Sequence, residues 1–178
     1  MASNATERDA LRRRAILDAA LSCFVQFGYA KTSLDDIARR ANLSRPLLYR
    51  KFRNKEDIFG AVYDDVFEAR YPAAEAILAG RGARRAKLMQ VYELLCVEPW
   101  ALVMDAPAVQ EFYDACKQVT PEVHARHERK LLELTRRVLG SKELAEVLML
   151  AVDGLFADLP SVAVLRKRLR LLIERFTS

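Results

Sequence analysis

Apolar residues recur along the chain with the three- and four-residue spacing of amphipathic helices. The first such stripe runs from Ile16 to Phe27, after a capping pair formed by Thr6 and Asp9. Gly28 follows, which predicts a left-handed residue that ends this helix. Shorter apolar stripes cover residues 34–41, 45–52 and 58–66. We therefore expect four helices and no strand in the first third of the chain.

The remaining residues continue the helical pattern. We expect a loop over residues 79–82, then a helix that ends near Pro99, and a long helix from Pro121 to Gly140. Two apolar stripes close the chain, over residues 142–155 and 162–176. Because only a short turn separates these last two helices, the sequence predicts that they pair in antiparallel orientation.

The second and third helices form a helix-turn-helix pattern. Ser33 and Ser44 are suitable N-caps, and Asn42 in the turn tolerates positive φ better than other non-glycine residues. The third helix buries Leu48 and Phe52 and turns outward a face that carries basic, phenolic and apolar side chains. That face consists of Arg45, Leu47, Tyr49, Arg50 and Lys51. It suits DNA, although a basic helix face is also common on ordinary protein surfaces.

Positive charge is concentrated in the same part of the chain. Residues 1–55 hold 12 Lys and Arg against 5 Asp and Glu, whereas the whole chain of 178 residues holds 29 against 24. The rest of the chain therefore has a slight acidic excess. This asymmetry is typical of a polyanion-binding domain attached to a near-neutral body, but it also fits a solvated basic face.

A specific combination of motifs lies between residues 11 and 66. The motifs are Phe24-x-x-x-Gly28-Tyr29, Thr32-Ser33, Ile37-Ala38-x-x-Ala41, Leu43-Ser44 and Leu48-Tyr49-x-x-Phe52-x-x-Lys55. This segment resembles the N-terminal domain of TetR-family transcriptional regulators. The resemblance implies an all-α protein with two domains. Residues 1–55 would form a three-helix helix-turn-helix DNA-binding domain, and residues 56–178 a helical effector-binding and dimerisation domain.

The resemblance also implies a set of DNA-binding residues. Thr32, Ser33, Tyr49 and Lys55 would contact phosphates, and the start of the third helix would enter the major groove. The complete set is Thr32, Ser33, Ser44, Arg45, Pro46, Leu47, Tyr49, Arg50, Lys51 and Lys55. Three positions depart from the family pattern: Asn42 replaces a frequent glycine, Pro46 a small residue, and Lys51 a frequent histidine. The base preference of other members therefore does not transfer.

The terminal helix pair implies a homodimer, because in the family the equivalent pair meets its twofold mate in a four-helix bundle. The expected interface residues are Leu148, Leu155, Leu165, Leu169, Leu172 and Phe176. The alternative is that both stripes face the core of their own subunit. Val164 and Leu171 add apolar surface beyond one stripe, which favours the dimer.

Candidate chemistry in the C-terminal part is limited. Five residues could line an apolar effector pocket: Tyr92, Trp100, Met104, Phe112 and Tyr113. Aromatic residues at helical spacing are also common in cores. His124 and His127 lie beside Glu122 and Glu128, but they lack a third clear ligand, so we expect no metal site and no cofactor. Neither Cys96 nor Cys116 lies in a motif that would activate a nucleophile.

The pattern as a whole predicts a cytoplasmic transcriptional regulator. No apolar run is long enough to span a membrane, the N-terminus is no signal peptide, and the three cysteines form no disulfide framework. We expect a homodimeric repressor that binds double-stranded DNA at a palindromic operator and is released by a small apolar or aromatic effector. An architectural DNA-binding protein without effector is the alternative. A helical enzyme is a third, but no acid–base or metal set supports it.

Overall fold

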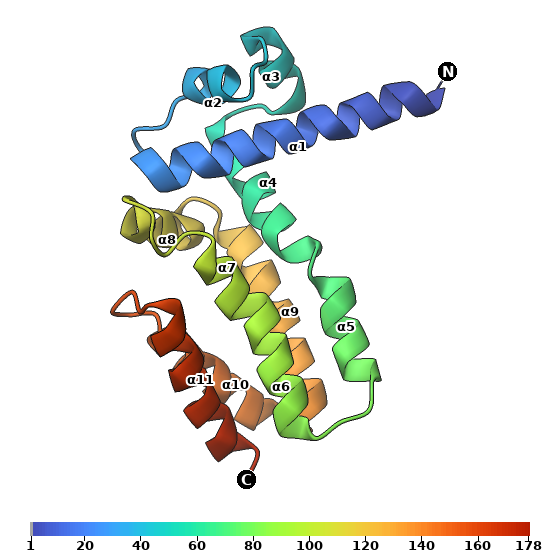
Figure 1. The fold of residues 1–178 in the computed structure, drawn as a ribbon, viewed down its shortest axis with the longest axis vertical. Coiled ribbons are helices and arrows are strands. Elements are labelled where there is room, and N and C mark those ends of the chain that lie inside the picture. The colour runs from blue at the N-terminus through green and yellow to red at the C-terminus, as the bar shows by residue number, and fades with distance from the viewer. Residues whose placement is uncertain (1) are drawn as a thin grey trace. The chain divides into compact units, whose positions relative to one another are not determined.

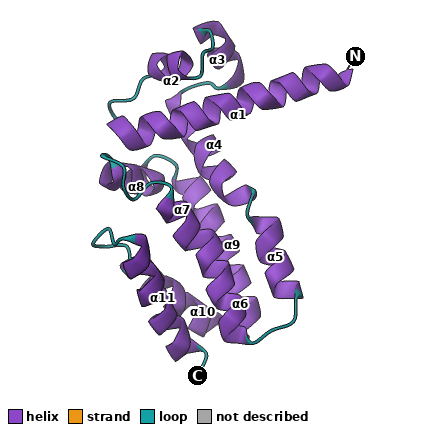
Figure 2. Ribbon diagram, viewed as in Figure 1, coloured by secondary structure: helices purple, strands orange, loops and turns teal. Residues whose placement is uncertain are grey.

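The computed structural model describes residues 2–178, with side chains from residue 7 onward, and this part of the chain is helical with no strand (Figures 1 and 2). Its elements are α1 (Ala2–Phe27), α2 (Leu34–Arg40), α3 (Arg45–Lys51), α4 (Lys55–Glu68), α5 (Tyr71–Ala79), α6 (Arg84–Tyr92), the π-helix η1 (Glu93–Val97), α7 (Glu98–Ala101), α8 (Val109–Gln118), α9 (Pro121–Leu139), α10 (Lys142–Gly154) and α11 (Val162–Phe176). The predicted all-α fold class is confirmed.

The chain divides into two compact units. Unit 1 contains residues 1–65 and 106–124, and unit 2 contains residues 66–105 and 125–178. The division therefore falls within α4 and within α9 and assigns α8 to the same unit as the helix-turn-helix. This division differs from the expected domain organisation, which has a single boundary after residue 55. The sequence could not place α8, because no local pattern reveals that a helix after residue 105 packs against α1.

In unit 1, α1 supplies the central apolar stripe. Ile16, Ala20, Cys23 and Phe24 are buried, as the spacing predicts. Phe27 is not part of this core, because it lies at the last position of the helix and is exposed. The helix begins at Ala2, ahead of the predicted cap at Thr6. Its end is as expected, since Gly28 has φ +83° and donates its N–H to the Phe24 carbonyl.

Unit 2 has its own core. A buried cluster consists of Ala74 of α5, Val91 of α6, Leu95 of η1 and Leu134 of α9. At the edge of this cluster, Glu75 pairs with both Lys130 and Arg137 of α9, at 2.9 and 2.7 Å. The hydrogen bonds from these two cations lower the pKa of the Glu75 carboxyl group.

The continuous helical segment formed by α6, η1 and α7 contains a π-helical turn just before Pro99. Proline has no N–H to donate, and its ring crowds the carbonyl four residues earlier, which here belongs to Leu95. A π-turn widens the backbone spiral at that point. The chain therefore stays helical past Pro99 to Ala101. The sequence predicts that the helix ends near Pro99, and this prediction is wrong.

Helices α10 and α11 pack against each other in unit 2, as predicted for the terminal pair. The outward face is not the predicted one: Leu148, Leu165 and Leu169 are buried inside the subunit, so they cannot lie on its outer surface. These three follow the alternative in which the stripe faces its own core. Large apolar side chains that do lie exposed on the pair are Leu144, Val147, Leu150, Val164 and Leu171.

Two further expectations concern the chain as a whole. None of the helices in residues 2–178 is long and apolar enough to cross a membrane. The three cysteines are free thiols, of which Cys23 and Cys116 are buried and Cys96 is half-buried. Burial raises the pKa of the Cys96 and Cys116 thiols to about 12, so both are protonated and unreactive at neutral pH.

Candidate DNA-binding surface

Helix α2 begins with a capping box. The Ser33 hydroxyl accepts the N–H of Asp36, and the Asp36 carboxylate in turn accepts the N–H of Ser33 at 3.0 Å. These bonds satisfy donors that a helix start leaves unpaired. The hydroxyl and N–H of Ser33 lower the pKa of Asp36, which keeps the carboxylate ionised. The start of α2 is therefore fixed by its own side chains.

A tight turn joins α2 to α3. Asn42 adopts φ +53°, as the sequence predicted, and Leu43 donates its N–H to the Ala38 carbonyl at 2.9 Å. Asparagine tolerates this left-handed conformation. Ser44 stands at the N-cap of α3, where its backbone carbonyl accepts the N–H of Leu48, but its side chain makes no cap bond. Ser44 is exposed.

The outward face of α3 is the main candidate for base contacts. Leu48 is buried in the core, as predicted. Phe52, the C-cap residue of α3, is also buried. Four predicted site residues on the opposite side are exposed: Arg45, Pro46, Tyr49 and Arg50. Leu47 is half-buried. Arg45 forms an ion pair with Asp35 of α2. This pair holds the guanidinium group against the first helix of the helix-turn-helix.

Two predicted phosphate contacts are engaged inside the unit instead. Thr32 is 2% exposed, and its hydroxyl donates to the carbonyls of Gly28 and Cys23 at 2.7 and 3.2 Å. The Lys55 ammonium donates to the carbonyls of Tyr29 and Thr32 at 2.8 and 3.0 Å, and it lies 4.3 Å from the centre of the Tyr29 ring. Both side chains therefore hold the loop between α1 and α2 in place.

Lys51 is a third predicted site residue with a partner inside unit 1. Its ammonium group pairs with Asp9 of α1, and the hydrogen bond from Lys51 lowers the pKa of Asp9. One turn further along α1, the Arg13 guanidinium lies 5.5 Å above the Phe52 ring. Through these two contacts, the N-terminal half of α1 stabilises the C-terminal end of α3. The sequence could not reveal this, because residues 9 and 51 belong to separate motifs.

A cleft of about 1000 Å³ opens beside the loop between α1 and α2. Helix α8 forms its other wall, and its Glu111 carboxylate accepts the N–H of Ala30 at 2.7 Å. That carboxylate also occupies the space beside Gly28, because a Cβ built on this glycine would lie 2.0 Å from a Glu111 oxygen. Gly28 is therefore required for two reasons, its positive φ and the close approach of Glu111.

The five predicted effector-pocket residues do not share one unit. Tyr92 is fully buried in unit 2 and hydrogen-bonded to Thr135, whose oxygen lies 3.0 Å from its own. Trp100 is 4% exposed there and donates to the Pro160 carbonyl at 2.7 Å. Met104, also of unit 2, is half-buried. The other two residues, Phe112 and Tyr113, lie on α8 in unit 1.

Comparisons with known proteins agree with this geometry. Residues 16–62 match the family described as bacterial regulatory proteins, tetR family. The transcriptional repressor ComR of Escherichia coli is 44% identical over 64 residues, 34% of this chain and 30% of ComR. A TetR-like transcriptional regulator from Rhodococcus sp. RHA1 has a TM-score of 0.66 at 26% identity, covering 93% of this chain and 95% of that one. SmeT, repressor of a Stenotrophomonas maltophilia multidrug efflux pump, has a TM-score of 0.69 at 23% identity, covering 92% and 87%.

The capped α2, the Asn42 turn and the exposed face of α3 define a helix-turn-helix protein of the all-α class. Residues 16–62 thus match the tetR family of bacterial regulatory proteins, and the chain is similar in fold to a TetR-like transcriptional regulator over 93% of its length. The chain spans about a third to a half of the length of the curated relatives it matches.

Proposed function

We propose that the chain is a sequence-specific, DNA-binding transcriptional repressor. The observation that carries this proposal is the outward face of α3, where Arg45, Tyr49 and Arg50 are exposed above a buried Leu48. Guanidinium groups read guanine in the major groove, and a phenol suits a phosphate. ComR, which shares the sequence of this domain most clearly among the relatives named above, is a repressor, which supports the same role here.

Selection of bound sequences from random duplex DNA tests this proposal. We expect one enriched motif with two inverted half-sites, about one helical turn apart. Arg50→Ala should relax preference at one operator position by ~1–3 kcal/mol, whereas Tyr49→Phe should weaken binding to all sequences alike. An absence of any enriched motif would identify the alternative, an architectural DNA-binding protein.

We further propose that the protein is a homodimer through α10 and α11. Three of the residues expected at the interface, Leu155, Leu172 and Phe176, are half-buried and still fit that role. Exposed Leu150 and Leu171 extend the same apolar surface, which a second copy would remove from water. Twofold symmetry of such a dimer would account for an inverted-repeat operator.

A small apolar or aromatic effector completes the proposed function. SmeT has been seen in complex with triclosan, an aromatic molecule, which supports an effector of this class for a protein of the same fold. Tyr92 and Trp100 already have partners in unit 2, so an effector would have to displace them or pack beside them. A panel of aromatic molecules, scored by thermal shift and by loss of operator binding, tests this part. Such a regulator acts where the DNA is, in the cytoplasm.

A further inference from the structure

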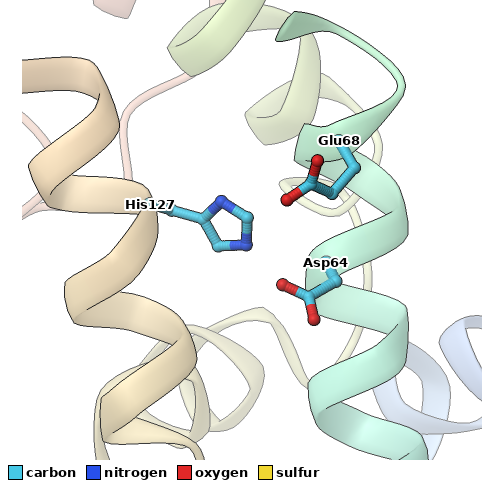
Figure 3. Close-up of side chains that lie close together, drawn as sticks. All are labelled: Asp64, Glu68 and His127. Carbon is cyan, nitrogen blue, oxygen red and sulfur yellow. The ribbon is translucent and has the colours of Figure 1, made fainter. Parts of the chain in front are cut away.

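The side chain of His127 has a packing role in unit 2 (Figure 3). The Phe67 ring stacks on the imidazole with the ring centres 4.8 Å apart, and the Tyr71 hydroxyl oxygen lies 2.5 Å from Nδ1. Of the two carboxylates drawn in the figure, Glu68 belongs to unit 2 and Asp64 belongs to unit 1. One imidazole and one carboxylate within a unit are fewer than the three or four protein ligands of a typical metal centre. Glu68 and His127 therefore do not form a metal site by themselves.

Two adjacent aspartates in the first turn of α2 have different partners. Asp36 closes the capping box with Ser33. Asp35 instead forms an ion pair with Arg45, the first residue of α3, and the carboxylate oxygen that faces Arg45 is buried. Successive side chains of an α-helix point about 100° apart, so the two carboxylates serve different surfaces. Asp35, Arg45 and the turn between them all lie in unit 1.

The backbone fixes the positions of both members of this pair. The capping box sets the start of α2, and Leu43 closes the following turn with its hydrogen bond to the Ala38 carbonyl. Pro46 comes directly after Arg45, and its ring fixes φ in the first turn of α3. The ion pair between Asp35 and Arg45 is therefore set by the fold of the helix-turn-helix.

The ion pair engages one side of the guanidinium group and leaves the other side available. The contact is through Nε, and 60% of the Arg45 side chain is exposed. Nη1 and Nη2 can therefore donate together to O6 and N7 of guanine, which is the commonest specific contact in the major groove. Lys51 differs, because its single nitrogen already pairs with Asp9 and a phosphate would have to compete with that carboxylate.

We propose that Asp35 is a positioning residue for base readout, which holds Arg45 by Nε so that its two terminal nitrogens face a guanine of the operator. This role rests on the proposed function of α3 as the recognition helix. On operator DNA the ion pair persists, because the base edge takes only the terminal nitrogens. On other DNA the binding comes from phosphates, and the Asp35 carboxylate repels them. The carboxylate thus favours the operator in two ways.

Asp35→Asn tests the proposal, because it keeps the shape of the side chain and removes its charge. Binding to the selected operator and to a random duplex of equal length is measured by fluorescence anisotropy. We expect the affinity for the operator to fall about three- to tenfold, a part of the discrimination that a bidentate base contact provides. The affinity for the random duplex should rise about two- to fivefold, because one carboxylate beside the DNA-binding face is lost. A selection repeated with the variant should lose preference at the operator position that Arg45→Ala also relaxes.

Asp18→Asn is the matched control. Asp18 is an exposed aspartate of unit 1 that pairs with Arg14 on the same helix, so this variant removes the same charge from a position outside α2 and α3. It should change both affinities by the same small factor and preserve their ratio. In an Arg45→Ala background, Asp35→Asn should no longer alter operator preference, since the group that Asp35 positions is gone. Asp35→Ser removes the same carboxylate and keeps the test decisive if asparagine impairs folding.

The ratio of operator affinity to random-duplex affinity decides the outcome. A fall of about sixfold or more in Asp35→Asn, with the ratio preserved in Asp18→Asn, supports the proposal. Equal changes of both affinities in Asp35→Asn would overturn it, because loss of charge alone acts on all DNA alike. Preference that survives at the position read by Arg45 would overturn it as well. Failure of the proposed function looks different: the unaltered chain would then enrich no motif, and Asp35 would have no base readout to position, so both proposals would fall.

Discussion

Replacing Gly28 with alanine tests how α8 supports the helix-turn-helix. Gly28 has φ +83°, and its missing Cβ leaves the space that the Glu111 carboxylate fills. An alanine Cβ at this position would lie 2.0 Å from one carboxylate oxygen, so the Glu111 side chain must move away. Movement of Glu111 breaks its hydrogen bond to the Ala30 N–H, which is 2.7 Å long. The substitution therefore has two separable costs.

The magnitude of each cost follows from its physical origin. A non-glycine residue in the left-handed region costs about 1 kcal/mol relative to glycine. Loss of the Glu111 hydrogen bond costs about 1 kcal/mol more, because the bond is solvent-exposed and its net contribution is then that of an ordinary protein hydrogen bond. Gly28→Ala should then lower the free energy of unfolding by about 2 kcal/mol, and Glu111→Ala by about 1 kcal/mol. In the double variant the clash is absent, so it should cost about 2 kcal/mol.

Urea denaturation of all four proteins, followed by circular dichroism, measures these differences. We expect the two substitutions to be non-additive by about 1 kcal/mol, which exceeds the few tenths expected of independent sites. If the double variant loses the sum of the two single effects, about 3 kcal/mol, Glu111 does not occupy the space beside Gly28 in solution and the reasoning fails.

Three further outcomes are expected. Thr32→Val keeps the shape of the side chain but leaves the Gly28 carbonyl without its donor, so the free energy of unfolding in urea should fall by about 1–2 kcal/mol; no change would mean that the hydroxyl is dispensable. Leu171→Glu places a charge on the exposed face of α11, so light scattering should show a smaller mass than for the unaltered chain, and an unchanged dimer would exclude this interface. The pKa of Glu75 is lowered by two cations, so its contribution to stability is present above about pH 4.5 and disappears as the pH falls. Glu75→Gln should therefore reduce the melting temperature slightly at pH 7 and by less at pH 3, and an equal reduction at both would contradict the ion pairs.

The fold was largely predictable because helix periodicity and capping are local signals. The positive φ of Asn42 and Gly28 and the burial of Leu48 follow from residues within one or two turns of each position. The position of α8 beside α1 was not predictable, since a single sequence carries no record of which distant helices meet. The π-helical passage before Pro99 was also missed, because proline alone indicates a helix end as readily as a bulge.

The candidate site was predictable at the level of the motif but not of each side chain. A family pattern places Thr32 and Lys55 near DNA, yet their polar groups are already engaged by backbone carbonyls of the loop between α1 and α2. On the terminal helices, periodicity distinguished an apolar stripe from a polar one. It could not say whether Leu165 faces its own subunit or another, because both surfaces exclude water in the same way.

The hydrogen bond from Trp100 to the Pro160 carbonyl has a spectroscopic consequence. Trp100 is the only tryptophan in the chain, so its emission is a single-site signal. The indole is almost fully buried and lies edge-on to Phe156, with ring centres 5.3 Å apart. Its emission maximum should therefore lie at short wavelength. A red shift would report that the segment joining α10 to α11 has detached from α7, and it would do so without any attached dye.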